Sequence, residues 1–311
     1  MKNKNNYIFA PAVSGSGFKM DGYFVWCGSV IKENGKYYLF AARWREETLF
    51  PVGYLGNSEI VIATTDDLKA PFKYEKTIIS KRDGGYWDSA MAHNPYIVKA
   101  ENGYYLYYIG SPDGSASGRK IGYAFSTTLL GEWHRSDEPI ELPPDANNPS
   151  VLRARDGRVL LYFRDGTRAS RVSVAVSDRY DGGFSVVNDN LFPECAVEDM
   201  FVYETRDGFR MIAEDCDGYY TDLRKGGIKA YSHDGVSWDS SRIIPAYDFT
   251  VEYDDGQVIE LQRRERPFIL FDDGRKYLFN GAKINGETTL TGGHTWNLVQ
   301  EIVGDRDEDT G

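Results

Sequence analysis

The sequence has no long apolar run, few cysteines and no excess of basic residues, and each of these shortages excludes a class of protein. No segment reaches the roughly 20 apolar residues that a membrane-spanning helix needs. The stretch MKNKNNYIFAPAVSG at the N-terminus lacks an apolar run of secretory length, so we expect a cytoplasmic protein unless a leader has been removed. The net charge of −11 argues against nucleic-acid and anionic-membrane partners.

Cysteine and histidine are also scarce, with three and four residues in a chain of 311. Cys27, Cys195 and Cys216 are odd in number and follow no metal-ligand spacing, so we expect three reduced thiols. What the chain has in abundance is glycine, with 32 residues, and aromatic side chains, at 14%. This mixture is typical of many short strands joined by turns.

The strands are arranged as an internal repeat. Each copy has an apolar strand, a turn with glycine, and then an aromatic-rich strand. The copies are WCGSVIKENGKYYLFAARW, HNPYIVKAENGYYLYYIGS, NNPSVLRARDGRVLLYFRD, EDMFVYETRDGFRMIAED and ERPFILFDDGRKYLFNGAK. They begin at residues 26, 93, 147, 198 and 265, which are 51 to 67 residues apart.

Each of the first four hairpins is followed by a third strand, as in SEIVIATT, and then by a more variable fourth. After Lys283 the fifth copy is less clear, and we expect ETTLTGGHTWNLVQE to supply its outer strands. The pattern predicts an all-β fold: a single five-bladed β-propeller over residues 1–311, with four antiparallel strands per blade. A long β-sandwich does not explain the repeated order of the blocks.

In a propeller the first strand of every blade lines the central channel, so the entrances of these strands gather at one mouth. The pairs at this step are Trp26–Cys27, His93–Asn94, Asn147–Asn148, Glu198–Asp199 and Glu265–Arg266. A scaffold that needed only a packed centre would have apolar residues at these positions. The polar pairs therefore predict a functional pocket in a central funnel.

Further polar residues are expected at the same mouth, because the end of the second strand lies beside the start of the first. The ends of second strands contribute Arg43, Trp44, Arg45, Arg164, Asp165, Glu214 and Asp215, and the loop before the second copy contributes Tyr86, Trp87 and Asp88. Acids, arginines and Trp faces around a concave site are what a sugar pocket requires. The predicted substrate-binding residues are Trp26, Arg43, Trp44, Trp87, His93, Asn94, Asn148, Arg164, Glu214, Asp215, Glu265 and Arg266.

Glycoside hydrolysis needs two carboxyl groups, one of them protonated. We expect Glu198 to be the general acid, because partial burial and the neighbouring Asp199 would raise its pKa. The alternatives are that Glu198 pairs with Arg266 and ties the ring of blades together, or that it binds substrate. For the second carboxylate Asp88 is the first candidate, with a turn cap as its alternative role, and Asp165 and Asp199 follow.

His93 is predicted either to bond a substrate hydroxyl, to ligate an axial metal or water, or to be a structural histidine beside Asn94. One histidine does not make a metal site. We therefore expect no cofactor, with a structural metal ion on the axis left as an alternative.

The chain resembles the five-bladed propeller glycoside hydrolases of family 43, which include arabinanases, xylosidases and α-L-arabinofuranosidases, and their invertase and levansucrase relatives. The resemblance rests on four segments: WCGSVIKENGKYYLF, YWDSAMAHNPYIVKAENGYYLYYIG, VEDMFVYETRDGF and RERPFILFDDGRKYLFNGA. These segments are especially similar to an uncharacterised, sucrase-related branch of the group. It implies a glycosidase with the general acid at Glu198. The family's general base, an Asp at the first-blade entrance, is absent from Trp26–Cys27–Gly28, and its pKa-modulating Asp is replaced within HNPY.

The expected function is therefore a glycoside hydrolase that removes a terminal sugar, furanosidic or related, from a small glycan or oligosaccharide. One alternative is a glycoside phosphorylase, in which Arg43, Arg45, Arg164 and Arg266 would bind phosphate. The other is a carbohydrate-binding propeller without turnover. The sequence does not indicate the sugar, the stereochemical outcome or the oligomeric state.

Overall fold

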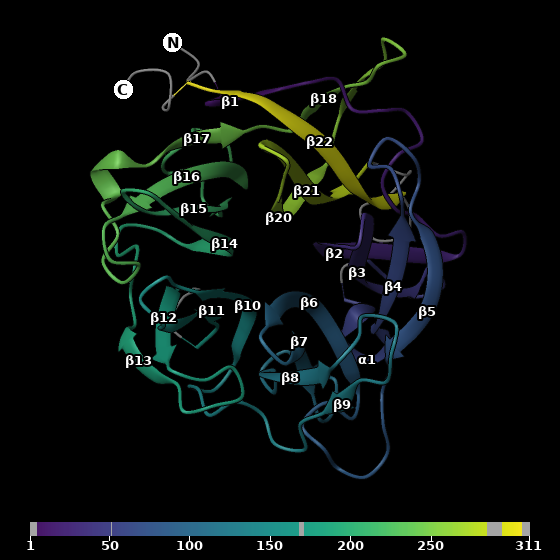
Figure 1. Ribbon diagram of the computed structural model, residues 1–311, viewed down its shortest axis with the longest axis vertical. Helices are drawn as coiled ribbons and strands as arrows, with labels where there is room; N and C mark the ends of the chain where they lie inside the picture. Colours follow the sequence, from purple (N-terminus) through teal and green to yellow (C-terminus); the bar gives the residue numbers. More distant parts are fainter. Residues whose placement is uncertain (1–4, 51, 168–170, 285–293, 307–311) are drawn as a thin grey trace.

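The computed structural model describes residues 5–50, 52–167, 171–284 and 294–306 of the chain. It is an all-β, five-bladed propeller, and the predicted fold class is confirmed (Figure 1). Helical structure is confined to α1 (Tyr54–Asn57) and the 3-10 turn η1 (Ser240–Arg242) among these residues. Over the same described ranges, we find no helix of the length and apolarity that crossing a membrane requires.

Each of the first four blades is a four-stranded antiparallel sheet in chain order, with its first strand nearest the axis (Figure 1). The first blade contains β2 (Tyr23–Glu33), β3 (Lys36–Arg45), β4 (Glu59–Thr65) and β5 (Lys73–Ile79). The second contains β6 (Met91–Ala100), β7 (Gly103–Ser111), β8 (Lys120–Ser126) and β9 (His134–Arg135). The third contains β10 (Ala146–Arg153), β11 (Val159–Asp165), β12 (Arg171–Ser177) and β13 (Ser185–Asn188). The fourth contains β14 (Val197–Thr205), β15 (Gly208–Asp215), β16 (Gly226–Ser232) and β17 (Ile244–Tyr247).

The fifth blade is closed by strands from both ends of the chain. Its order is β20 (Arg263–Asp272), β21 (Arg275–Lys283), β22 (Thr295–Asp305) and β1 (Tyr7–Phe9), and a separate hairpin, β18 (Thr250–Glu252) and β19 (Val258–Glu260), precedes it. The expectation that the segment after Lys283 supplies both outer strands is wrong in part. That segment forms β22, whereas the outermost strand is β1, and residues 287–293 of the expected stretch lie outside the described residues. Pairing β1 with β22 joins the two ends of the chain in one blade and so closes the ring.

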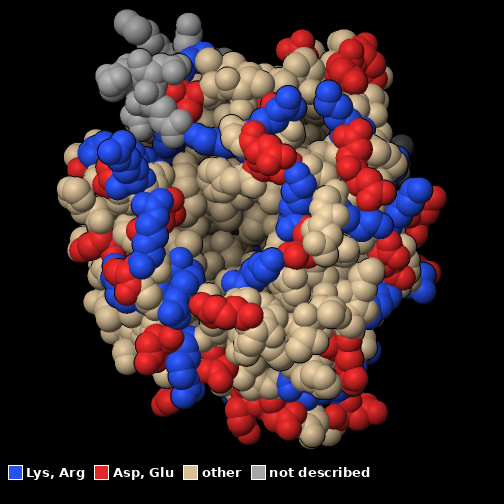
Figure 2. Space-filling view, viewed as in Figure 1, with Lys and Arg blue, Asp and Glu red and all other residues tan. Residues whose placement is uncertain are grey.

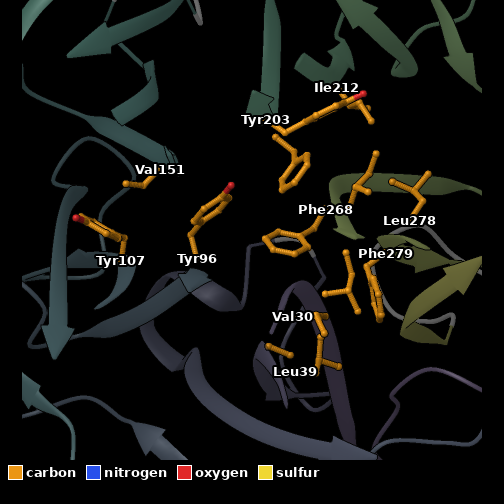
Figure 3. Close-up of a cluster of buried hydrophobic side chains, with 14 of the residues drawn as sticks. Val30, Leu39, Tyr96, Tyr107, Val151, Tyr203, Ile212, Phe268, Leu278 and Phe279 are labelled. Carbon is orange, nitrogen blue, oxygen red and sulfur yellow. The ribbon is translucent and has the colours of Figure 1, made fainter. Parts of the chain in front are cut away.

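The axis is apolar at one level and polar at the next. Tyr96, Phe201 and Phe268 extend from three inner strands and meet at the centre, with ring centroids 4.7 to 6.4 Å apart. Figure 3 shows Tyr96 and Phe268 pointing toward one another there. These three rings belong to a large buried cluster that also fills the spaces between blades. The channel is therefore plugged on one side, and the opposite mouth becomes a closed-ended cavity.

Candidate active site

A cavity of about 130 Å³ lies at the polar end of the axis, where the five inner strands begin. On the face seen in Figure 2, side chains of both charges surround a central hollow. Its volume is below the roughly 300 Å³ at which sites for drug-sized ligands begin, so it fits one small ring better than an extended chain. The described residues that line it are Trp26, Trp44, Phe50, Tyr54, His93, Asn94, Ile109, Arg119, Asn148, Arg164, Glu198, Asp199, Arg263, Glu265 and Arg266.

Every inner strand carries the same irregularity at the cavity. The ladder between first and second strand shifts register at each of the five predicted pairs. The second residue of each pair is left-handed, with φ between 48° and 60°: Cys27, Asn94, Asn148, Asp199 and Arg266. A bulge with a left-handed residue interrupts the alternation of side chains across the strand. Both residues of a pair can therefore be directed to the axis.

The five left-handed residues form a closed ring of hydrogen bonds around the axis. The Cys27 thiol donates to Asn94 Oδ1 at 2.6 Å, Asn94 Nδ2 donates to Asn148 Oδ1 at 2.6 Å, and Asn148 Nδ2 donates to Asp199 Oδ1 at 2.7 Å. Arg266 bonds the same Asp199 oxygen at 3.3 Å and also bonds the Cys27 thiol. One residue from each blade is thus fixed to its neighbours, and four of the five, all except Cys27, line the cavity.

Glu198 is held between two cations on the cavity wall. Its Oε2 lies 3.2 Å from Arg164 and its Oε1 lies 3.0 Å from Lys225 Nζ. Burial opposes ionisation, but Arg164 and Lys225 outweigh it and hold the pKa of Glu198 below its ordinary value. The expectation of a raised pKa is therefore wrong. The sequence did not show that two cations from other strands and loops would reach this carboxyl group.

Two more carboxylates line the cavity beside Glu198. Burial raises the pKa of Asp199 to about 6, with Arg266 opposing the rise. Glu265 accepts a hydrogen bond from Arg263 at 2.8 Å and lies 3.4 Å from Lys225 Nζ. The pKa of Glu198 is thus lowered and that of the adjacent Asp199 is raised, and neighbouring acids whose pKa values differ are the arrangement that acid–base chemistry uses.

The opposite wall is aromatic and neutral. Trp44 stacks on Phe50 with ring centroids 5.6 Å apart, and Tyr54 stacks on His93 at 4.4 Å. His93 Nδ1 bonds the Ser58 hydroxyl at 2.8 Å. Burial, helped by Arg266 and Arg119, lowers the pKa of His93 to about 3. His93 is therefore a neutral polar group among flat apolar faces, as in a site that binds a sugar ring.

The neutral state of His93 makes stability depend on pH. The unfolded chain takes up a proton on this imidazole below about pH 6.5, whereas the folded protein does so only near pH 3. Because the unfolded state binds more protons in this window, the contribution of His93 to stability falls as pH decreases. Between pH 7 and pH 5 we expect wild type to lose about 2 kcal/mol more unfolding free energy than His93→Gln. Urea unfolding at both values measures this, and equal losses would contradict it.

Trp87 and Asp88 do not line the cavity, so their predicted placement is wrong. The Trp87 ring lies over Gly110 and Gly122 of the second blade, where an added Cβ would come within 2.5 Å of the indole. Asp88 is fully buried and accepts hydrogen bonds from Arg82 Nε at 2.6 Å and the Tyr108 hydroxyl at 2.7 Å. The pair anchors the loop to the blade face, and Asp88 has no access to a substrate in the funnel.

Asp165 and Arg43 also lie away from the cavity. Asp165 is buried and accepts bonds from the amide and hydroxyl of Thr167, which closes the turn after β11. Arg43 pairs with Glu59 at 2.7 Å, toward the outer strands of its blade. In each strand the adjacent residue, Arg164 or Trp44, reaches the cavity instead. Because side chains alternate along a regular strand, two consecutive residues point to opposite faces, and only one of them can face the cavity.

Glu214 and Asp215 are fully buried behind the wall and do not line the cavity. Asp215 bonds the amides of Tyr219, Tyr220 and Thr221 at 2.8 to 3.0 Å and so organises the following loop. Glu214 bonds Lys225 Nζ at 2.5 Å. Neither residue lines the cavity, so their predicted placement at the mouth is wrong.

The remaining predicted residues are brought together as expected: Trp26, Trp44, His93, Asn94, Asn148, Arg164, Glu198, Asp199, Glu265 and Arg266. Sequence reasoning missed Phe50, Tyr54, Arg119 and Arg263, and also Lys225 behind them. Arg263 had a signal, since it lies two residues before the Glu265 pair. The others come from α1 or from loops, where the repeat pattern carries no information about the axis.

Among the described residues, two groups of side chains have ligand atoms within 4.8 Å of one another and could hold a metal ion. The first is Glu198, Glu214 and Cys216, and the second is Asp199, Glu214 and Glu265. In both groups at least one carboxylate is already bonded by Lys225. This ammonium supplies the positive charge that a metal ion would supply. None of the three cysteines, all of which lie in the described part of the chain, forms a disulfide.

The chain matches no family model and no curated protein, but solved structures share its fold. A family 117 glycoside hydrolase from the marine bacterium Zobellia galactanivorans is 16% identical, with a TM-score of 0.70 over 96% of this chain and 91% of that one. A family 43 β-xylosidase/α-arabinofuranosidase from a compost metagenome, in complex with xylotriose, is 14% identical, with a TM-score of 0.67 over 96% and 97%. An arabinanase of Bacillus subtilis is 14% identical, with a TM-score of 0.61 over 88% and 92%. The resemblance stated from the sequence is confirmed at the level of the fold: this chain has the five-bladed propeller architecture of family 43 and family 117 glycoside hydrolases.

Proposed function

We propose that the protein is a glycoside hydrolase that removes a terminal sugar from a small glycan. The observation that carries the proposal is the closed-ended axial cavity, which combines Glu198, Asp199 and Glu265 with a wall of Trp and Tyr rings. Carboxyl groups of unequal proton affinity supply acid–base chemistry, and aromatic faces bind sugar rings. A cavity closed at one end admits a chain terminus and excludes the middle of a polymer.

Within this proposal Glu198 works as an ionised carboxylate. Arg164 and Lys225 favour its charged form, which suits a base or nucleophile better than a proton donor. The proton donor is then Asp199, with its pKa near 6, or Glu265 on the adjoining blade. This reverses the role expected from the sequence for Glu198, which was that of general acid, and it replaces Asp88, the first candidate for the second carboxylate.

The test is sugar release by the purified protein from nitrophenyl glycosides and short oligosaccharides. Fold neighbours described as a β-xylosidase/α-arabinofuranosidase and an exo-1,5-α-L-arabinanase support beginning with xylosides and arabinofuranosides. Release of a single terminal sugar supports the proposal, and proton NMR of the first product then gives the stereochemical outcome. Sugar binding without turnover on the whole panel would indicate a carbohydrate-binding propeller instead.

Phosphorolysis is a second candidate because four arginines line the cavity: Arg119, Arg164, Arg263 and Arg266. Two of the arginines expected for this role, Arg43 and Arg45, are not among the lining residues. Each of the four is paired with a carboxylate, which leaves few donors for a phosphate group. Running the panel with and without inorganic phosphate separates the two reactions, since only a phosphorylase requires phosphate and releases a sugar phosphate.

A further inference from the structure

Lys225 places a positive charge among three acids at the edge of the cavity. Its Nζ lies 3.0 Å from Glu198 Oε1, 2.5 Å from Glu214 Oε1 and 3.4 Å from Glu265 Oε1. Glu198 and Glu265 come from the inner strands of two adjacent blades, β14 and β20. A single ammonium therefore bridges the blades where both present a carboxylate to the cavity.

The loop that carries Lys225 is built around one buried acid. Asp215, at the end of β15, bonds three consecutive backbone amides of this loop, and its own carbonyl accepts from the Lys225 amide at 2.6 Å. Lys225 itself is left-handed, with φ of 66°. This conformation is costly for a residue with a long side chain and persists only where the surroundings enforce it. In this strained backbone conformation, the Lys225 side chain directs its ammonium group at the three carboxyl groups.

The charges around Lys225 explain why it stays protonated. Burial alone would lower its pKa, but Glu265, Glu214 and Glu198 outweigh burial and raise it. Arg164 faces the other oxygen of Glu198, and Arg263 faces Glu265. The remaining neighbours of Glu198 that titrate are Asp199 and Cys216. Among these groups Lys225 is the cation shared by Glu198 and Glu265.

We propose that Lys225 is a positioning residue of the candidate active site, whose ammonium group holds the Glu198 and Glu265 carboxylates side by side and keeps Glu198 charged. The proposal rests on the proposed function, because it assigns Lys225 to the reaction through these two acids. A lysine that only tied the loop to the blades would change stability without changing how Glu198 titrates.

The experiment replaces Lys225 by Met, which removes the charge and keeps the length, and by Arg, which keeps the charge. Protein labelled with 13C at the glutamate carboxyl carbons is titrated by NMR, and Glu198→Gln identifies the Glu198 signal. We expect the midpoint for Glu198 to move upward by about one to three pH units in Lys225→Met and by much less in Lys225→Arg. Thermal unfolding shows that both variants are folded at the temperature of the titration.

An unchanged Glu198 midpoint in folded Lys225→Met would overturn the proposal. The result does not depend on turnover, so it holds even if no glycoside is cleaved and the proposed function fails. Where sugar release is observed, the acidic limb of its pH profile is expected to move in the same direction and by the same amount. A limb that stays in place while the NMR midpoint moves would show that Glu198 is not the group that limits the rate.

Discussion

Glu198→Gln is expected to lower the rate of sugar release by at least about a hundredfold at constant protein concentration. The substitution keeps the shape of the side chain but removes its ability to carry a negative charge or a transferable proton. Arg164 and Lys225 would then face a neutral amide, with both cations near the position where positive charge develops on the sugar. The measurement is the initial rate on the best substrate from the panel.

Asp88→Asn is the matched control for this prediction. It also changes a buried carboxylate to its amide, but Asp88 bonds Arg82 and Tyr108 outside the cavity. We expect lower thermal stability in this variant and an unchanged rate at temperatures where it remains folded. A loss of activity in Asp88→Asn as large as that in Glu198→Gln would show that both effects arise from instability.

Recovery of sugar release in Glu198→Ala on addition of azide would support a base or nucleophile role for Glu198, since a small anion replaces the missing carboxylate.

Arg266→Met is expected to lower the free energy of unfolding by about 3–5 kcal/mol. Arg266 and Asp199 are 6% and 4% exposed and lie 3.3 Å apart in the axial ring. Without Arg266 the buried Asp199 keeps Glu198 and Glu265 as neighbours of like charge and has lost its buried counter-charge. Urea unfolding of wild type and variant at neutral pH measures the difference.

Two further variants show whether the loss comes from the stranded charge. Asp199→Asn combined with Arg266→Met removes both charges, and we expect the double variant to be more stable than Arg266→Met alone. Arg275→Met removes an exposed arginine at 3.7 Å from Glu301 and should leave stability almost unchanged. The account of the ring would fail if Arg266→Met were as stable as Arg275→Met.

The five pairs at the strand entrances were predictable because they repeat. A propeller brings equivalent positions of each copy to one axis, so the pattern alone predicted that Glu198, His93 and Arg266 share a site. The left-handed backbone at the second residue of each pair was not predictable from residue type. Asn and Asp tolerate this conformation, but Cys27 and Arg266 adopt it as well. The ring of hydrogen bonds follows from that shared geometry.

The errors arose at the ends of the second strands and in the loops. Both members of Arg164–Asp165 were expected at the mouth, whereas alternation along a regular strand allows only one of two neighbours to face it. Glu214 and Asp215 were also expected there, but both are buried behind the cavity wall. Trp87 and Asp88 precede an inner strand, yet the Trp87 indole packs against the blade face, in the space left by Gly110 and Gly122. The number of residues between a side chain and the inner strand does not reveal such packing.

The sequence by itself determined the number of blades, the order of the strands in the first four blades and the polarity of the axial positions, because these depend on local periodicity repeated along the chain. Only the tertiary structure decided the protonation of the acids. Arg164 comes from β11 of the third blade and Lys225 from the loop before β16 of the fourth, and both charges lie beside Glu198 on β14. Electrostatic interactions depend on distances in space between residues far apart in the chain, and those distances exist only after the blades have closed into a ring.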